Sequence, residues 1–161
     1  MRNMNVANHP YLGNETATVV FGDLDNFSEC MQKMGWTEYH PNRITAFLTE
    51  KAQRLIKIHQ AVHLWGLDPN RGTEEFILAF FQAPQFVKKE MEQLQRDIND
   101  LAEELGAKTS LSIGMATGKL QRMKPLANNS KKELKKDPTV FLAYKALRKA
   151  KKSNKSTIVL Y

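Results

Sequence analysis

Two acidic pairs in this sequence are spaced so that they could bind a metal ion and phosphates. Asp23 and Asp25 follow an apolar run that ends at Gly22, and Glu74 and Glu75 precede a second apolar run. If the first run is a buried strand, Asp23 lies at its carboxyl end, the edge where open α/β sheets bind ligands. Carboxylates suit Mg²⁺ or Mn²⁺, which usually share their ligands with substrate phosphates. The pattern predicts a metal-phosphate site, provided that folding brings the two pairs together.

Length and composition are those of a globular protein. The chain has 161 residues, of which 42% are hydrophobic and 25% charged, enough for one domain with a real core. We expect an irregular arm over 1–15 and a single domain over 16–161. Neither a signal segment nor a run of about eighteen apolar residues is present, so the sequence predicts a cytoplasmic protein that does not enter a membrane. The single cysteine, Cys30, excludes an internal disulfide and a cysteine-based zinc cluster, and we expect it to be buried.

Positive charge is concentrated near the end of the chain. The net charge is +7, and the stretch 119–155 holds thirteen Lys or Arg residues against Glu133 and Asp137. Such a stretch attracts nucleic acid, an acidic membrane surface or nucleotide phosphates, but it is equally consistent with a solvated face. Charge alone leaves these alternatives open.

Hydrophobic periodicity predicts strands and helices that alternate. We expect strands at 16–22, 61–66, 75–81, 109–116 and 156–161, the second and third forming an antiparallel hairpin. We expect helices at 27–34, 44–59, 84–105 and 140–152, and a loop with a lysine-rich helical turn over 117–138. The predicted order is βααββαβαβ, which favours an α/β (α+β) two-layer sandwich around a five-stranded, mainly antiparallel sheet.

Four motifs in this order resemble the GGDEF and nucleotidyl cyclase superfamily. They are Asp-Leu-Asp-Asn-Phe at 23–27, Gly-Thr-Glu-Glu-Phe at 72–76, the strand-like segment 109–116, and the helix and basic turn at 146–155. The resemblance covers nearly the whole chain after residue 16. The superfamily's palm-like, ferredoxin-like domain also occurs in class III adenylyl cyclases, CRISPR-associated cyclic oligonucleotide polymerases and archaeal GTP cyclohydrolase III.

The resemblance implies the residues of an active site. Asp23 and Glu74 would bind Mg²⁺ or Mn²⁺ with help from the Leu24 carbonyl, and Asp25 is a further candidate ligand. The nucleoside triphosphate, GTP or ATP, would be held by a larger set: Asn26, Phe27, Arg71, Gly72, Thr73, Lys151 and Lys155. The family usually completes its active site by pairing two protomers, so the resemblance also implies a homodimer.

Three of these residues have a second interpretation. Asp25 is either a metal ligand or the cap of the helix that follows it. Arg71 is either a phosphate clamp or an exposed arginine of a turn. Lys151 either binds phosphate or compensates the helix dipole. Glu75 is expected to be a surface residue or a salt-bridge partner, because successive strand side chains face opposite sides and the resemblance favours Glu74.

The sequence also departs from the family's pattern. Thr73 replaces the second glycine of the signature, and its Cβ restricts how closely the backbone approaches a phosphate. Met31 and Gln32 stand where diguanylate cyclases read guanine. The leading hypothesis is a metal-dependent nucleotidyl cyclase or transferase that makes a cyclic mono- or oligonucleotide and releases pyrophosphate. The alternatives are a GTP cyclohydrolase III-like hydrolase, a non-catalytic nucleotide sensor, and a nucleic-acid-binding module that uses 119–155.

Overall fold

Five strands form one sheet in the order β2-β3-β1-β4-β5. The computed structural model describes residues 16–121, 130–153 and 156–161. All neighbouring strands are antiparallel except β4 and β5, which are parallel. The predicted five-stranded, mainly antiparallel α+β fold is therefore confirmed, while the expected arm at 1–15 lies outside the described residues. The strands are β1 (Thr16–Leu24), β2 (Val62–Gly66), β3 (Glu75–Phe80), β4 (Leu111–Lys119) and β5 (Ile158–Leu160).

The helices begin and end close to the predicted positions. Gly35 and Gly106 take left-handed φ values of 72° and 67° after α1 and α3, which explains why these helices stop there. Pro84 opens α3 at a position where its missing N–H costs nothing. One short helix, α4, occupies part of the stretch where a lysine-rich turn was predicted. The helices are α1 (Phe27–Met34), α2 (Arg43–His59), α3 (Pro84–Leu105), α4 (Lys131–Leu134) and α5 (Pro138–Lys152).

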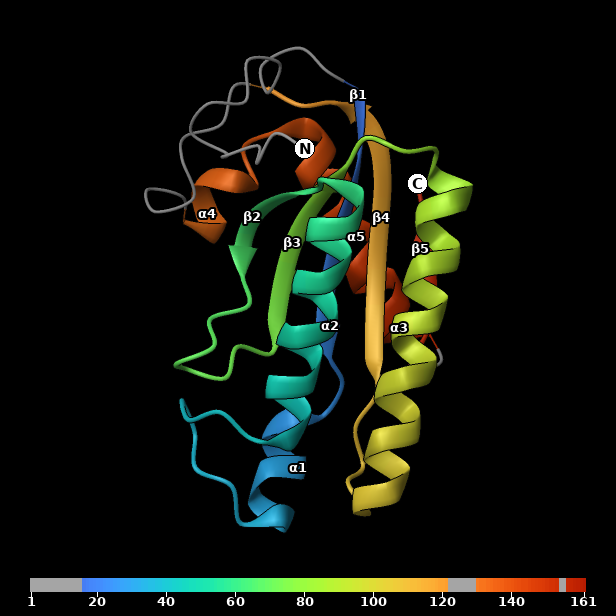
Figure 1. The fold of residues 1–161 in the computed structure, drawn as a ribbon. Coiled ribbons are helices and arrows are strands. Elements are labelled where there is room, and N and C mark those ends of the chain that lie inside the picture. Colours follow the sequence, from blue (N-terminus) through green and yellow to red (C-terminus); the bar gives the residue numbers. More distant parts are fainter. Residues whose placement is uncertain (1–15, 122–129, 154–155) are drawn as a thin grey trace.

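Helices cover both faces of the sheet (Figure 1). On β1, Val20 and Leu24 face a core shared with α1, α2 and α3, whereas Val19 and Phe21 face a second core shared with α4 and α5. The expected two-layer arrangement is therefore too simple, since α5 forms a further layer on the opposite face. The physical reason is the continuous apolar run of β1, which needs cover on both sides.

Helix α5 lies against β4 with its backbone almost in contact. A Cβ built on Gly114 would lie 2.1 Å from the Leu147 nitrogen and 2.2 Å from the Ala143 oxygen. Glycine is thus required here, because any side chain would collide with the backbone of α5. Because Lys151 follows one turn after Leu147, this close packing brings its side chain over the end of β1.

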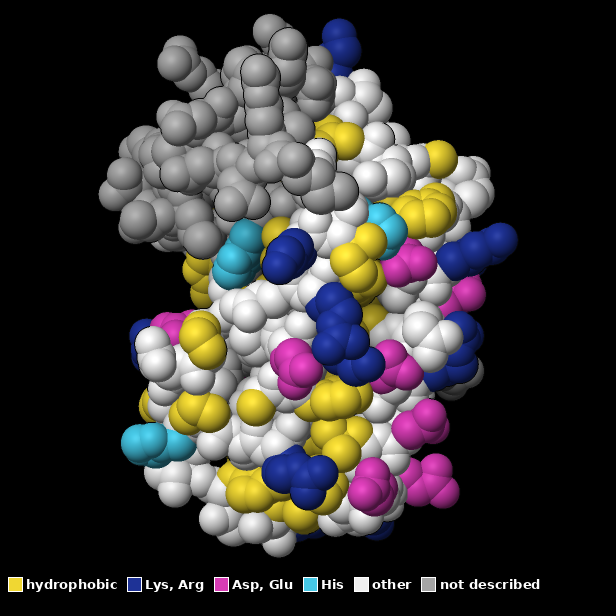
Figure 2. All heavy atoms as spheres, viewed as in Figure 1, with side chains coloured by type: hydrophobic (Ala, Val, Ile, Leu, Met, Phe, Trp, Pro, Cys, Tyr) yellow, Lys and Arg dark blue, Asp and Glu magenta, His cyan; other side chains and the backbone are white. Residues whose placement is uncertain are grey.

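The outer face of α2 and α3 carries a mixture of charges. Acidic and basic side chains intermingle there with hydrophobic ones, as Figure 2 shows. The described lysines of the basic stretch belong mainly to α4 and α5, which pack on the other face of the sheet. Within the described ranges, no helix combines the length and the apolar character needed to cross a membrane.

Candidate active site

Asp23 and Glu75 lie opposite each other on neighbouring strands. They are register partners in the antiparallel pair β1–β3, and residues opposite each other in such a pair place their side chains on the same face. Val19 and Phe21, four and two residues before Asp23, face α5, so Asp23 and Glu75 face α5 as well. Two carboxylates from distant parts of the sequence therefore meet at one end of the sheet.

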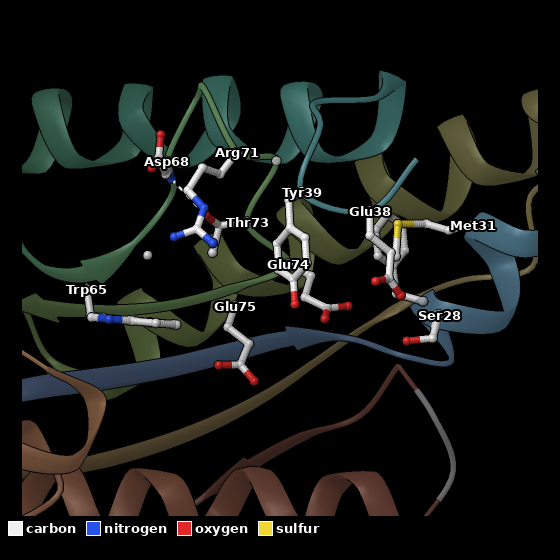
Figure 3. A pocket seen from close by; sticks show the side chains of 13 residues that line it. Ser28, Met31, Glu38, Tyr39, Trp65, Asp68, Arg71, Thr73, Glu74 and Glu75 are labelled. Atoms are coloured by element: carbon white, nitrogen blue, oxygen red, sulfur yellow. Dashed lines mark hydrogen bonds between the residues drawn. The ribbon is translucent and has the colours of Figure 1, made fainter. Parts of the chain in front are cut away.

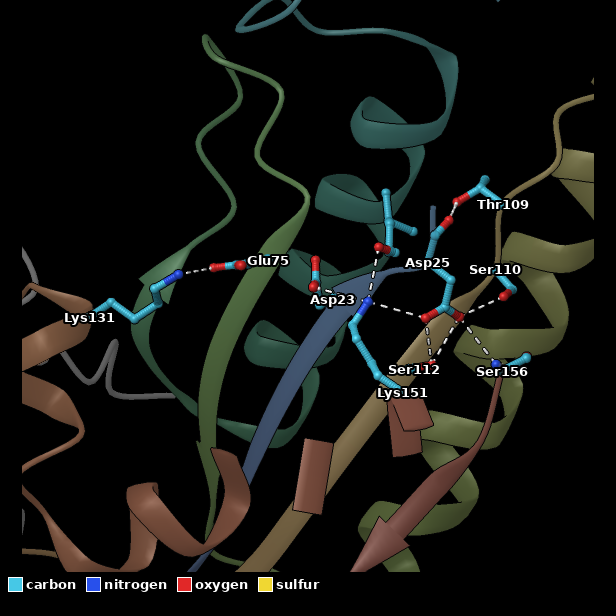
Figure 4. A network of polar contacts seen from close by, with 10 residues as sticks. Asp23, Asp25, Glu75, Thr109, Ser110, Ser112, Lys131, Lys151 and Ser156 are labelled. Carbon is cyan, nitrogen blue, oxygen red and sulfur yellow. Dashed lines mark hydrogen bonds and ion pairs between the residues drawn. The ribbon is translucent and has the colours of Figure 1, made fainter. Parts of the chain in front are cut away.

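Lys151 from the last turn of α5 reaches this end of β1 (Figure 4). Its Nζ lies 3.0 Å from Asp23 Oδ2, 3.1 Å from Asp25 Oδ1 and 3.2 Å from the Leu24 carbonyl oxygen. Three of the four residues assigned to a metal, Asp23, Leu24 and Asp25, thus surround a single positive charge. Lys151 itself was predicted to meet a triphosphate, and here it contacts the acids instead.

Asp25 is a buried anchor, and its prediction as a helix cap is wrong. The N-cap of α1 is Asn26, in a left-handed conformation with φ 50° and without a side-chain cap bond. The Asp25 carboxylate is 3% exposed and accepts hydrogen bonds from other elements, because β1 continues to Leu24 and carries Asp25 toward β4. Its donors are Ser110 Oγ at 2.6 Å, Ser112 Oγ at 2.7 and 2.9 Å, and Ser156 N at 3.2 Å, besides Lys151.

Glu74 lies beside the same site but in a different setting. Its carbonyl accepts a hydrogen bond from the Leu24 nitrogen at 3.1 Å, which holds it next to the end of β1. Its side chain forms no ion pair with another described residue, and it lines an open pocket together with Glu75. Glu75 forms an ion pair with Lys131, as expected of a salt-bridge partner, but strand alternation is not what distinguishes the two acids, because β3 begins only at Glu75.

The pocket has a volume of about 820 Å³ and an acidic, aromatic lining. Figure 3 shows its side chains converging from α1, from the loop before α2 and from the β2–β3 connection. Such a volume is typical of small-molecule sites, which are mostly lined by apolar groups with a few placed polar ones. The lining residues are Phe27, Ser28, Met31, Glu38, Tyr39, Trp65, Gly66, Asp68, Arg71, Gly72, Thr73, Glu74 and Glu75.

Several residues assigned to the nucleotide line this pocket. Phe27 lines it, and so do Arg71, Gly72 and Thr73, which follow one another in the β2–β3 connection. Of these, Arg71 lies 5.4 Å from the centre of the Tyr39 ring, Gly72 has φ 66° next to His40, and the Thr73 hydroxyl accepts from the Asp68 nitrogen at 3.1 Å. At the position where the family has a glycine, Thr73 therefore supplies a side-chain hydrogen bond within the β2–β3 connection.

The remaining nucleotide candidates lie elsewhere. Asn26 belongs to the cap of α1 and does not line the pocket. Lys151 contacts the acids of β1, and Lys155 lies outside the described residues.

Burial and charge both act on the ionisation of these groups. Burial raises the pKa of Asp23 to about 7, with a smaller opposing effect of Lys151 and a further rise caused by the charges of Glu75 and Glu74. Burial and the charge of Glu75 likewise raise the pKa of Glu74. Burial alone would lower the pKa of Lys151, but the charges of Asp23 and Asp25 raise it overall. The lysine is therefore a firmly held cation.

Lys131 is a site residue that the sequence did not single out. Its Nζ forms an ion pair with Glu75 Oε2 at 2.7 Å and lies 5.3 Å from the centre of the Trp65 ring. The sequence signal was only a general one, the lysine-rich stretch 119–155. Nucleic-acid binding by that stretch stays a prediction, but Lys131 and Lys151 face acids and are not part of a freely exposed basic surface.

The described side chains do not form a closed metal site. Across 16–121, 130–153 and 156–161, no group of three His, Cys, Asp or Glu residues is arranged to hold a metal ion. The oxygens around Lys151 Nζ come from two carboxylates and one backbone carbonyl. Any metal here would have to take further ligands from substrate or water, as Mg²⁺ commonly does.

The fold matches that of a nucleotidyl cyclase. No family model matches the chain, and no curated protein sequence does so either. Among solved structures, the chain is similar to the crystal structure of the guanylyl cyclase Cya2, with 17% sequence identity and a TM-score of 0.55. The alignment covers 84% of this chain and 71% of that one. The chain thus has a nucleotidyl cyclase-like, palm-like fold, and at this identity the similarity concerns the fold alone.

Proposed function

We propose that this protein is a divalent-metal-dependent nucleotidyl cyclase or transferase. It would join a ribose hydroxyl of a nucleoside triphosphate, GTP or ATP, to an α-phosphate and release pyrophosphate, giving a cyclic mono- or oligonucleotide. One observation carries the proposal: oxygens of Asp23 and Leu24 converge on one positive charge beside a pocket lined by Glu74 and Glu75.

The donor set fits Mg²⁺ or Mn²⁺. Asp23 Oδ2 and the Leu24 carbonyl already hold a cation, the Lys151 ammonium, at 3.0 and 3.2 Å. Glu74 beside them has no ion pair within the described part of the chain and would complete the set. Asp25 fits less well, because serine hydroxyls and a backbone N–H occupy its oxygens. A bound metal would polarise the α-phosphate and favour ionisation of the attacking hydroxyl.

The neighbouring pocket suits a nucleotide in size and chemistry. Phe27, Tyr39 and Trp65 offer flat apolar surfaces to a base, and Arg71 and Lys151 can bind phosphate oxygens. The pocket is open on one side, so we also expect a second protomer to complete it, as the resemblance implies. The acidic residues hold the cations, and the basic ones orient the triphosphate for in-line attack.

Product analysis tests this function directly. The purified protein is incubated with each α-³²P-labelled NTP and Mn²⁺ at pH 8, and cyclic products and pyrophosphate are measured. Asp23→Ala should lower turnover about 100-fold or more, since it removes a metal ligand. The matched control Asp100→Ala, an exposed acid on α3, should leave turnover unchanged. Absence of both products with all four NTPs would refute the cyclase, and formate release from GTP would identify the GTP cyclohydrolase III-like alternative.

A second candidate is a nucleotide sensor that binds without turnover. It is favoured by the ion pair Lys151–Asp23, which neutralises an acid that catalysis would use. Calorimetry would then detect nucleotide binding, while pyrophosphate and formate would both be absent.

A further inference from the structure

Two lysines from different helices neutralise the carboxylates at the end of the β1–β3 pair. Lys151 of α5 contacts Asp23 at 3.0 Å, and Lys131 of α4 contacts Glu75 at 2.7 Å. Asp23 and Glu75 are register partners, so the two ammonium groups serve one acidic site. Figure 4 shows Lys131 and Lys151 reaching it from separate segments of the chain.

Both lysines are held in place by packed elements. The last turn of α5 has Ala150 fully buried, and Lys151 itself is only partly exposed. Helix α4 is fixed by buried Leu134 and by Ser130, whose hydroxyl accepts from the Glu133 nitrogen. Lys131 is thus presented by an anchored turn. An ion pair between an exposed lysine and a carboxylate contributes little to stability. Stability alone therefore does not account for two lysines that are held in place at one acidic site.

The ammonium group of Lys151 occupies a position that suits a bound cation. Lys151 Nζ is surrounded by oxygens of three residues, Asp23, Leu24 and Asp25, and a divalent cation prefers such oxygen ligands. Both lysines also act on the remaining acid, since the charges of Lys151 and Lys131 each lower the pKa of Glu74 against the larger effect of its burial. A divalent cation and either ammonium group would therefore repel each other at this site.

We propose that Lys131 and Lys151 are exchangeable counter-ions of the acidic site, which leave Glu75 and Asp23 when divalent cations bind and then contact the triphosphate. Lys131 is thereby a phosphate-binding residue in addition to those already named. The proposal rests on the proposed function for its substrate. It explains how one site holds its acids together before metal and nucleotide arrive.

Metal binding without nucleotide tests the exchange. Mn²⁺ affinity is measured at pH 8 by the EPR signal of free Mn²⁺ for wild type, Lys151→Met and Lys131→Met. Removing either competing charge should tighten Mn²⁺ binding about ten-fold. Lys152→Met and Lys132→Met, exposed neighbours on the same two helices, should bind Mn²⁺ as wild type does. Lys151→Arg keeps the charge and should also bind as wild type, which separates competition from any disturbance of folding.

Nucleotide binding supplies the second measurement. The affinity for a non-hydrolysable NTP at saturating Mn²⁺ should fall about ten-fold in Lys151→Met and in Lys131→Met, since each loses one charged contact to phosphate. Unchanged or weaker Mn²⁺ binding in both variants would overturn the exchange, even if the wild type turns over NTP. Tighter Mn²⁺ binding and weaker analogue binding, in a protein that turns over no NTP, would support the exchange and refute the proposed enzyme.

Discussion

The two aspartates of the Asp-Leu-Asp motif belong to regions with opposite properties. On the β3 side of β1, Asp23 shares a partly open site with Glu75 and has one strong partner, Lys151. On the β4 side, Asp25 is 3% exposed and is held by Ser110, Ser112 and the Ser156 backbone as well as by Lys151. Two acids of the same type, two residues apart, are thus the proposed reactive acid, Asp23, and a structural anchor, Asp25. The difference lies in hydrogen bonding, because the Asp25 carboxylate accepts from several donors and the Asp23 carboxylate contacts Lys151 alone among those named.

Replacing the anchor should have the largest effect. Asp25→Ala removes a buried charge that Lys151 pairs with and leaves two serine hydroxyls without their acceptor, so the free energy of unfolding should fall by about 3–5 kcal/mol. Urea denaturation measures this loss. The exposed acid Asp100 provides the control, since Asp100→Ala should change stability by less than about 0.5 kcal/mol. Similar values for the two variants would show that Asp25 is not an anchor.

Replacing the reactive acid should affect turnover and leave the fold intact. We expect Asp23→Asn to remain folded at pH 8 and to lose about 100-fold in NTP turnover, because one metal ligand becomes neutral. Pyrophosphate release measures the rate, and circular dichroism checks the fold. Full turnover in this variant would remove the distinction between the two aspartates.

A single donor to the anchor should matter less than the anchor itself. Ser112 is fully buried and its hydroxyl contacts both Asp25 oxygens. Ser112→Ala should therefore lower the free energy of unfolding by about 1.5–3 kcal/mol, the range for hydrogen bonds to charged groups. The exposed Ser153→Ala serves as a control, and equal urea midpoints for both variants would contradict the expectation.

The pH dependence of stability should show the smallest effect. Burial raises the pKa of Asp23 to about 7 from 3.8, so the folded state binds a proton more tightly than the unfolded state. This carboxyl therefore favours folding at low pH, and its contribution is lost as the pH rises from about 4 to about 7. Because Asp23 is partly exposed and paired, we expect a change of about 1 kcal/mol. Thermal unfolding in EDTA at pH 5 and 8 measures it, and Asp23→Asn should lack this component.

Much of the fold follows from local patterns in the sequence. Gly35, Pro84 and Gly106 mark helix ends through their backbone preferences, and the helix ends expected at 34, 84 and 105 are confirmed. Burial of Cys30 was also correct. The second helical layer was missed because the apolar run of β1 shows that both faces are covered but does not identify the covering element.

The site was less predictable because it depends on register and long-range packing. The pairing of Asp23 with Glu75 follows from the β1–β3 register, which one sequence does not determine. The anchoring of Asp25 was missed in favour of a metal ligand or a helix cap, because its donors, Ser110, Ser112 and Ser156, lie far along the chain and give no local signal. Lys131 was one of many lysines in a basic stretch. The role of each of these side chains thus depends on residues that are near it in the fold but distant in the sequence, and hydrophobic periodicity does not reveal them.

The contact between Gly114 and α5 affects the spacing of groups in the candidate site. No side chain separates Gly114 from the backbone at Ala143 and Leu147, so the height of α5 above the sheet is set by two main chains. A methyl group at position 114 would lift the end of the helix and draw the Lys151 ammonium away from Asp23. The distance between this cation and its carboxylate is therefore governed by a residue that touches neither of them.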